Sequence, residues 1–138
     1  MPEALSGPIR LNLGFAAAVA RVREALKAEG FGILTEVDMQ SAFLEKLGKP
    51  FRPYLILGAC DPPLAHRALS ADPTVGLLLP CNVIVEEEAP GQVLVRLADP
   101  QQLLATGDLG AHRDVRDVAD DASARLRRVA VSLRRAGA

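Results

Sequence analysis

The sequence predicts a single α+β domain in which helices pack on one face of a mainly antiparallel sheet. Three observations favour this class. Strand-like and helix-like segments alternate along the 138-residue chain, and no linker, repeat or low-complexity tract divides it. Two strand-like segments between residues 82 and 97 are joined by a tight turn, which is typical of antiparallel pairs. The competing class, a doubly wound parallel sheet, lacks its glycine-rich strand-to-helix fingerprint.

The composition is that of a folded protein with balanced charge. Hydrophobic residues make up 49% of the chain, and sixteen basic and seventeen acidic residues leave a formal net charge of −1. We expect no nucleic-acid partner, because phosphate binding needs a basic face and base stacking needs aromatic residues, which make up 4%. No apolar run is long enough to span a bilayer, and residues 1–8 lack the pattern of a secretion signal. We therefore expect a cytoplasmic protein that does not bind a membrane.

The first half of the chain predicts strands and helices in alternation. Apolar and polar residues alternate from Ile9, and from Phe15 the apolar spacing becomes that of a helix. Gly30 is expected to end this helix, because glycine adopts the left-handed conformation without steric cost. The elements that follow are a strand at 31–37, a helix at 39–47 and a strand at 54–59. This last strand is apolar at consecutive positions, so we expect it to be central and covered on both faces.

The second half predicts a helix, a hairpin and two further helices. Asp61 and Pro62 are a typical N-cap and first helical residue, and Asp99 and Pro100 repeat this pair. The remaining elements are an apolar segment at 75–79 (a short strand or a buried irregular run), hairpin strands at 82–87 and 92–97, a short helix through Leu104, and an amphipathic helix at about 112–136.

The two cysteines mark the candidate functional site. Cys60 ends an apolar strand just before a helix, where backbone N–H groups favour a thiolate, although the adjacent Asp61 opposes one. Cys81 stands in the segment L-P-C-N, directly before Asn82. We interpret Cys60, Asp61, Pro62, Cys81 and Asn82 as a ligand-binding site. The alternative is that both cysteines are small buried hydrophobes and that L-P-C-N only shapes the start of a strand.

Three kinds of function fit these residues. In the first, which we favour, the chain is a small-ligand or soft-metal binding and regulatory module, with zinc or copper held by Cys60, Cys81 and His66. In the second, it is a thiol-dependent enzyme or redox protein that uses Cys60 and Cys81, with His66 or His112 as the base. In the third, it is a purely structural interaction domain. The acidic run at 86–88 is interpreted as a solvated strand edge. No motif selects a particular reaction.

The oligomeric state can also be inferred from the composition. Aliphatic residues are many and aromatic residues few, so we expect apolar strand surfaces that one layer of helices does not cover. Such surfaces predict a homodimer. The remaining expected partner is the small molecule or metal of the candidate site.

Several segments, matched in order, resemble the domain-of-unknown-function 302 family of small prokaryotic proteins. They are G-F-G-I-L-T-E-V-D from Gly30, E-K-L-G, F-R-P-Y-L-I-L-G-A-C-D-P-P-L-A and L-L-L-P-C-N-V-I-V, and they lie in roughly residues 9–105 of the predicted domain 1–138. The resemblance implies an antiparallel α+β fold and a tendency to dimerise. Many members carry asparagine at the position of Cys60, so the resemblance implies no thiol chemistry common to the family. It implies no activity, and it points to the same five site residues.

Overall fold

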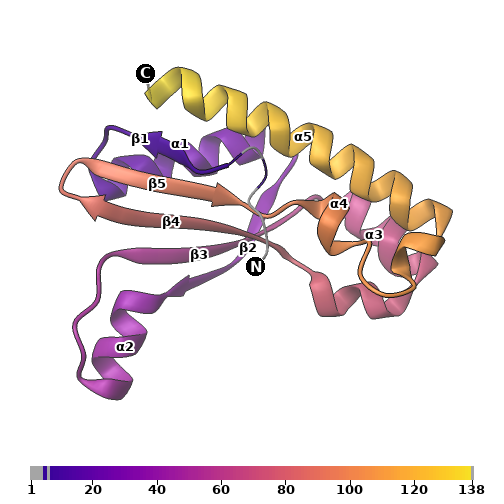
Figure 1. Cartoon of the computed structure of the whole chain (residues 1–138), viewed down its shortest axis with the longest axis horizontal. Coiled ribbons are helices and arrows are strands. Elements are labelled where there is room, and N and C mark those ends of the chain that lie inside the picture. The colour runs from indigo at the N-terminus through magenta and orange to yellow at the C-terminus, as the bar shows by residue number, and fades with distance from the viewer. Residues whose placement is uncertain (1–4, 6, 138) are drawn as a thin grey trace.

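Five strands form one sheet with the order β1-β5-β4-β3-β2 in the computed structural model, which describes residue 5 and residues 7–137. Every neighbouring pair of strands is antiparallel. The predicted α+β fold is therefore confirmed (Figure 1). The strands are β1 (Ile9–Leu11), β2 (Gly32–Asp38), β3 (Tyr54–Cys60), β4 (Cys81–Ala89) and β5 (Gln92–Leu97). The helices are α1 (Phe15–Ala28), α2 (Met39–Leu47), α3 (Pro62–Ala71), α4 (Pro100–Leu103) and α5 (Arg113–Gly137), with short 3₁₀ helices η1 (Pro73–Leu78) and η2 (Leu109–Ala111).

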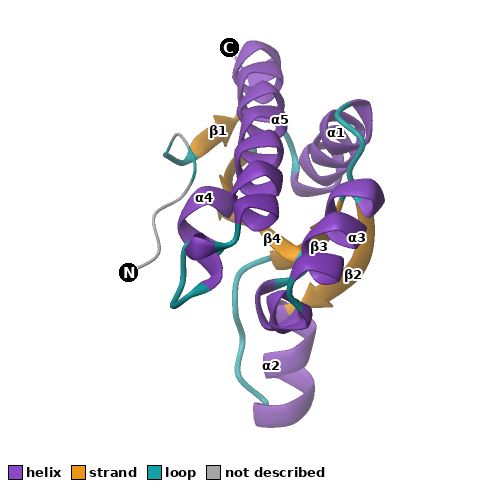
Figure 2. Cartoon of the chain, turned by 90° about the vertical axis from the view of Figure 1, so that its right-hand side faces the viewer, coloured by secondary structure: helices purple, strands orange, loops and turns teal. Residues whose placement is uncertain are grey.

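The main core lies between one face of the sheet and helices α1 and α5. Val22 of α1 and Leu126 of α5 pack against Leu57, Val83 and Val95 of three strands, and all five side chains are almost fully buried. A second apolar cluster lies between α3, α4 and the first turns of α5. Figure 2 shows α5 and α1 next to each other, with α2 extending away from them. None of the helices in the described part of the chain is long and apolar enough to cross a membrane.

The helix boundaries follow the predicted capping residues. Asp38, Asp61 and Asp99 each accept a hydrogen bond from a backbone N–H in the first turn of α2, α3 and α4. Gly30 and Gly48 have positive φ angles of 89° and 63°, as expected for glycines that follow a helix. These short-range signals act within one turn of the chain, so they could be read without the tertiary structure.

Residues 75–79 are not the short strand or buried irregular run that the sequence predicted. They belong mostly to η1, which begins where the Asp72 carboxylate accepts a hydrogen bond from the Thr74 N–H at 2.9 Å. Val75 is fully buried, but the Leu77 side chain is 88% exposed. The aspartate cap turns the chain into a 3₁₀ helix, which places successive apolar side chains on different sides.

Strand β3 is also not covered on both faces as predicted. Leu55, Leu57 and Ala59 face the helices and are buried, whereas Tyr54 and Ile56 are half-buried on the opposite side. Within the described residues, no helix lies across this opposite side, which we call the open face (Figure 1). The strand register and the alternation of side chains assign these residues to it: Thr35, Val37, Tyr54, Ile56, Gly58, Asn82, Ile84, Glu86, Leu94 and Arg96.

Candidate functional site

The two cysteine segments lie next to each other in the sheet. Ala59 pairs with Cys81 and Gly58 pairs with Asn82, so the end of β3 lies beside the start of β4. The sequence interpretation therefore identified two segments that the fold does bring together. Cys60, Asp61 and Cys81 line one small cavity of about 30 Å³ beneath α3. A volume of this size holds about one water molecule.

The five predicted ligand residues do not line a single site. Asn82 lies on the open face and lines a different cavity, because successive side chains of a strand point to opposite faces. Pro62 is exposed in the first turn of α3. The structure thus separates Asn82 and Pro62 from the two cysteines and Asp61.

The predicted zinc or copper site of Cys60, Cys81 and His66 is not assembled. Leu64 and Ala68 of α3 point into the apolar cluster, so His66, midway between them on the helix, is exposed. Among the residues that the structure describes, no three side chains of histidine, cysteine, aspartate or glutamate form a group able to hold a metal ion.

Both thiols are held in the neutral form at physiological pH. Burial raises the pKa of the Cys81 thiol to about 11, and the nearby Cys60 adds to this effect. Burial and then the charge of Asp61 raise the pKa of the Cys60 thiol as well. His112, the second candidate base, instead lies with its Nε2 atom 3.2 Å from the Asp72 carboxylate. A nucleophilic or metal-binding thiolate needs a lowered pKa, so this arrangement does not favour one.

The raised pKa values predict slow alkylation of the folded protein. Iodoacetamide should label Cys60 and Cys81 more slowly than free cysteine at neutral pH, because the reacting thiolate is scarce. The neutral Cys81 thiol stabilises the fold below pH 9.0, its ordinary pKa, and this contribution is lost as the pH rises to about 11. Mass spectrometry of protein labelled at a series of pH values, from neutral to about 11, measures the alkylation rates. Rapid labelling of the folded protein at neutral pH would contradict the assignment.

Asp61 has a structural role in addition to capping α3. Its Oδ1 atom accepts the Leu64 N–H at 3.3 Å, and its Oδ2 atom lies 3.3 Å from Nη1 of Arg125 in α5. The same guanidinium donates to the Glu29 carbonyl at 3.2 Å and, through Nε, to Asp121 at 2.9 Å. This buried carboxylate therefore joins the end of β3 to α5 and to the turn after α1.

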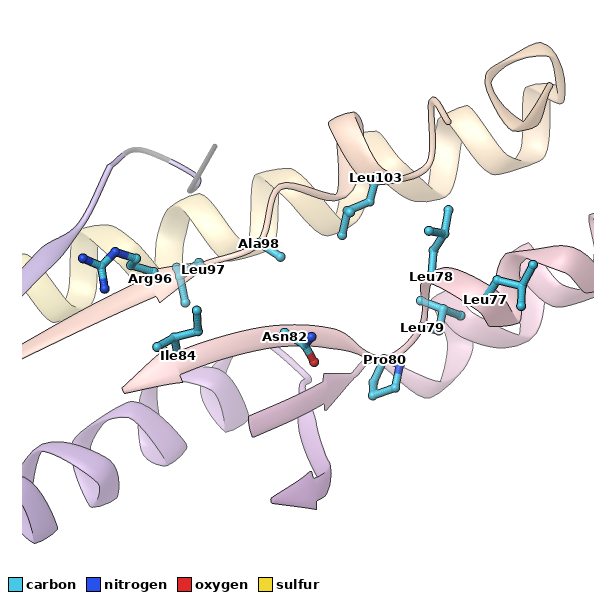
Figure 3. A pocket seen from close by; sticks show the side chains of 10 residues that line it. All are labelled: Leu77, Leu78, Leu79, Pro80, Asn82, Ile84, Arg96, Leu97, Ala98 and Leu103. Carbon is cyan, nitrogen blue, oxygen red and sulfur yellow. The ribbon is translucent and has the colours of Figure 1, made fainter. Parts of the chain in front are cut away.

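A second cavity, on the open face, measures about 440 Å³. Figure 3 shows the leucines of η1 and α4 at one end, with Ile84 and Arg96 at the other and Asn82 between them. The lining is mainly apolar, and its polar side chains are Asn82 and Arg96. The sequence interpretation identified Asn82 but missed the other residues that line this cavity. The apolar run before Pro80 was the sequence signal that could have indicated them. The lining residues are Leu77, Leu78, Leu79, Pro80, Asn82, Ile84, Arg96, Leu97, Ala98 and Leu103.

An ion cluster around the buried carboxylate of Glu86 lies beside this cavity. The Glu86 carboxylate is bound by Nη1 of Arg96 and, at 3.0 Å, by Nε of Arg52. Burial acts to raise the pKa of Glu86, but hydrogen bonds and charges from Arg96 and Arg52 outweigh it and hold the pKa below its ordinary value. The Arg52 guanidinium also lies 4.5 Å from the centre of the Phe51 ring. The interpretation of the acidic run as a solvated edge is therefore wrong for Glu86.

The comparisons with known proteins agree with the resemblance seen in the sequence. The family model described as Domain of unknown function DUF302 matches residues 9–133. A crystal structure of an uncharacterized conserved DUF302 protein from Bacillus stearothermophilus is similar, with a TM-score of 0.79 and 29% sequence identity. The similarity covers 92% of this chain and 96% of that one. No curated protein matches the chain. The chain therefore belongs to the DUF302 family.

Proposed function

We propose that this protein is a small-ligand binding module whose ligand occupies the cavity on the open face. The observation that carries the proposal is the cavity of about 440 Å³ with its apolar walls and two polar side chains, Asn82 and Arg96. Sites for small molecules are usually concave and mostly apolar, with volumes of about 300–1,000 Å³ and a few polar groups that orient the ligand.

This cavity supports a binding function better than the cysteine region does. The cavity beside Cys60 and Cys81 is about 30 Å³, too small for more than a water molecule. Both thiols have raised pKa values, which counts against the alternative of a thiol-dependent enzyme. The ligand is therefore assigned to the open face, with Asn82 as the residue retained from the sequence-based site.

Blocking the cavity is expected to abolish binding of an apolar probe. The Ala98 side chain lines the cavity, so an Ala98→Phe substitution fills part of the space that the probe needs. We expect 1-octanol to shift the methyl NMR signals of Leu77, Ile84 and Leu103 in the wild type, and to bind at least about tenfold more weakly to Ala98→Phe. The matched control is Ala17→Phe on the exposed side of α1. Equal binding by Ala98→Phe and the wild type would contradict the proposal.

We also propose that a second copy of the chain binds the surface formed by β2 and α2. β2 is an edge strand of the sheet, and no residue of α2 is buried. Leu34, Val37, Leu44 and Leu47 are exposed by 44–64%, so this segment carries four exposed large apolar side chains. Exposed apolar surfaces of this kind mark interaction sites.

The charges of the same surface suit a second copy as its occupant. Glu36 and Asp38 precede α2, whereas Lys46 and Lys49 lie at or just beyond its end. In a two-fold dimer whose axis is perpendicular to α2, each end of the surface meets the opposite end of the other copy. The acidic end of one copy then lies against the basic end of the other, which is electrostatically favourable.

A further inference from the structure

We propose that the ligand of the open-face cavity is an aliphatic carboxylate, with its hydrocarbon chain among the leucines and its carboxylate bound by Arg96, which Glu86 holds next to Arg52. This inference rests on the proposed function, because it specifies the chemistry of the ligand in that cavity. It uses residues that the sequence interpretation did not connect: Glu86, Arg52 and Arg96.

The ion cluster at the end of the cavity carries an excess of positive charge. Two guanidinium groups surround the single carboxylate of Glu86, so the cluster has a net charge of +1. The neighbouring pair on the same side of the sheet, Arg10 with Glu88, is neutral in sum. An anionic group beside Arg96 would balance the excess charge, whereas a cationic group would be repelled.

Both guanidiniums have donors in addition to those that Glu86 uses. An arginine side chain has five N–H donors. In the described residues, Glu86 is bound through Nη1 of Arg96 and Nε of Arg52. These two bonds leave the Nη groups of Arg52 and the Nη2 group of Arg96 as further donors, and a carboxylate matches the planar geometry of a guanidinium.

The two arginines are oriented before a ligand binds. The buried Glu86 carboxylate fixes one nitrogen of each guanidinium, and the Phe51 and Tyr54 rings lie 4.5 Å and 5.9 Å from the Arg52 guanidinium carbon. Such preorganisation reduces the conformational entropy that binding must remove. The second arginine leaves one positive charge of the cluster unbalanced, and the carboxylate of a ligand would match it.

The positions of apolar and charged groups in the cavity fit a molecule with one polar end. Figure 3 shows Arg96 at the end of the cavity farthest from Leu77 and Leu78. A hydrocarbon chain that starts at Arg96 passes Ile84 and Asn82 before it reaches these leucines. The Arg96 side chain is 37% exposed, so solvent screens part of its charge and the hydrocarbon chain contributes a large share of the affinity.

The test compares three probes of equal chain length by calorimetry at neutral pH and low salt, below micelle-forming concentrations. The wild type is expected to bind octanoate about tenfold more tightly than 1-octanol, and octylamine more weakly than either. In Arg96→Gln, the affinity for octanoate should fall to the affinity for 1-octanol, whereas the affinity for 1-octanol should not change. Arg10→Gln is the matched control, because Arg10 pairs with Glu88 and does not line the cavity. The Arg10→Gln variant should keep the preference for octanoate over 1-octanol.

The outcomes separate the two proposals. Equal binding of octanoate and 1-octanol by the wild type would overturn the carboxylate assignment and leave the small-ligand proposal intact. Absence of binding by all three probes would overturn both. Loss of the octanoate preference in Arg10→Gln to the same extent as in Arg96→Gln would overturn the assignment to Arg96. If circular dichroism shows that Arg96→Gln is unfolded, Arg52→Gln replaces it, with a smaller but still selective loss of octanoate affinity expected.

Discussion

Replacement of Gly58 by alanine is expected to destabilise the protein by about 1–3 kcal/mol, the usual range when a methyl group is forced into a packed site. A Cβ atom at Gly58 would overlap Oγ1 of Thr35 and would lie 2.6 Å from Cγ of Pro80. The Thr35 side chain can rotate away, but the Pro80 ring cannot, because its bonds to the backbone close it. Pro80 must therefore move, and the cavity that it lines should change shape.

Two measurements test this prediction. The urea midpoint of Gly58→Ala should fall, and its affinity for 1-octanol should fall with it, because the same proline is displaced. The control is Gly14→Ala, since a Cβ atom at Gly14 meets no atom within 4 Å and the φ angle there is −63°. Adding Thr35→Ala should recover part of the stability by removing the shorter contact. A Gly58→Ala variant as stable as the wild type would contradict the close packing.

The close contact at Gly58 illustrates which parts of the fold the sequence could predict. The capping residues Asp38, Asp61 and Asp99 act on N–H groups within three residues, so the helix starts were visible in the sequence. The consecutive apolar residues of β3 were correctly interpreted as a strand, but they do not say what covers each face. Ile56 is apolar and yet lies on the open face, so the prediction of two covered faces was wrong.

The candidate site was predicted in part for a similar reason. Cys60 and Cys81 were chosen for their chemistry, and the β3–β4 register does place their segments together. Their protonation depends on burial, which the sequence does not report, and burial raises both pKa values. The cluster of Glu86 with Arg52 and Arg96 joins residues 34 and 10 positions apart. Only the strand pairing brings these side chains into contact, so no local sequence pattern could predict the cluster.

Substitution of Leu44 and Leu47 by glutamate is expected to convert the proposed dimer to a monomer. Both leucines are about 60% exposed on α2, and two carboxylates on each copy would face an apolar surface without partners. The isolated fold should keep its stability, because no residue of α2 is buried and glutamate is a good helix former. Multi-angle light scattering at micromolar concentration measures the mass directly. The wild type is expected to have twice the mass of the variant.

A matched control distinguishes this surface from other exposed leucines. Leu69 of α3 is 40% exposed and lies outside the β2–α2 segment, so Leu69→Glu should remain dimeric. A wild-type monomer at the same concentration would refute the dimer. The proposed dimer surface and the cavity lie on different strands, since β2 is an edge strand and the cavity is lined from β4 and β5. The monomeric variant should therefore bind octanoate as the wild type does, so that assembly and ligand binding are tested independently of each other.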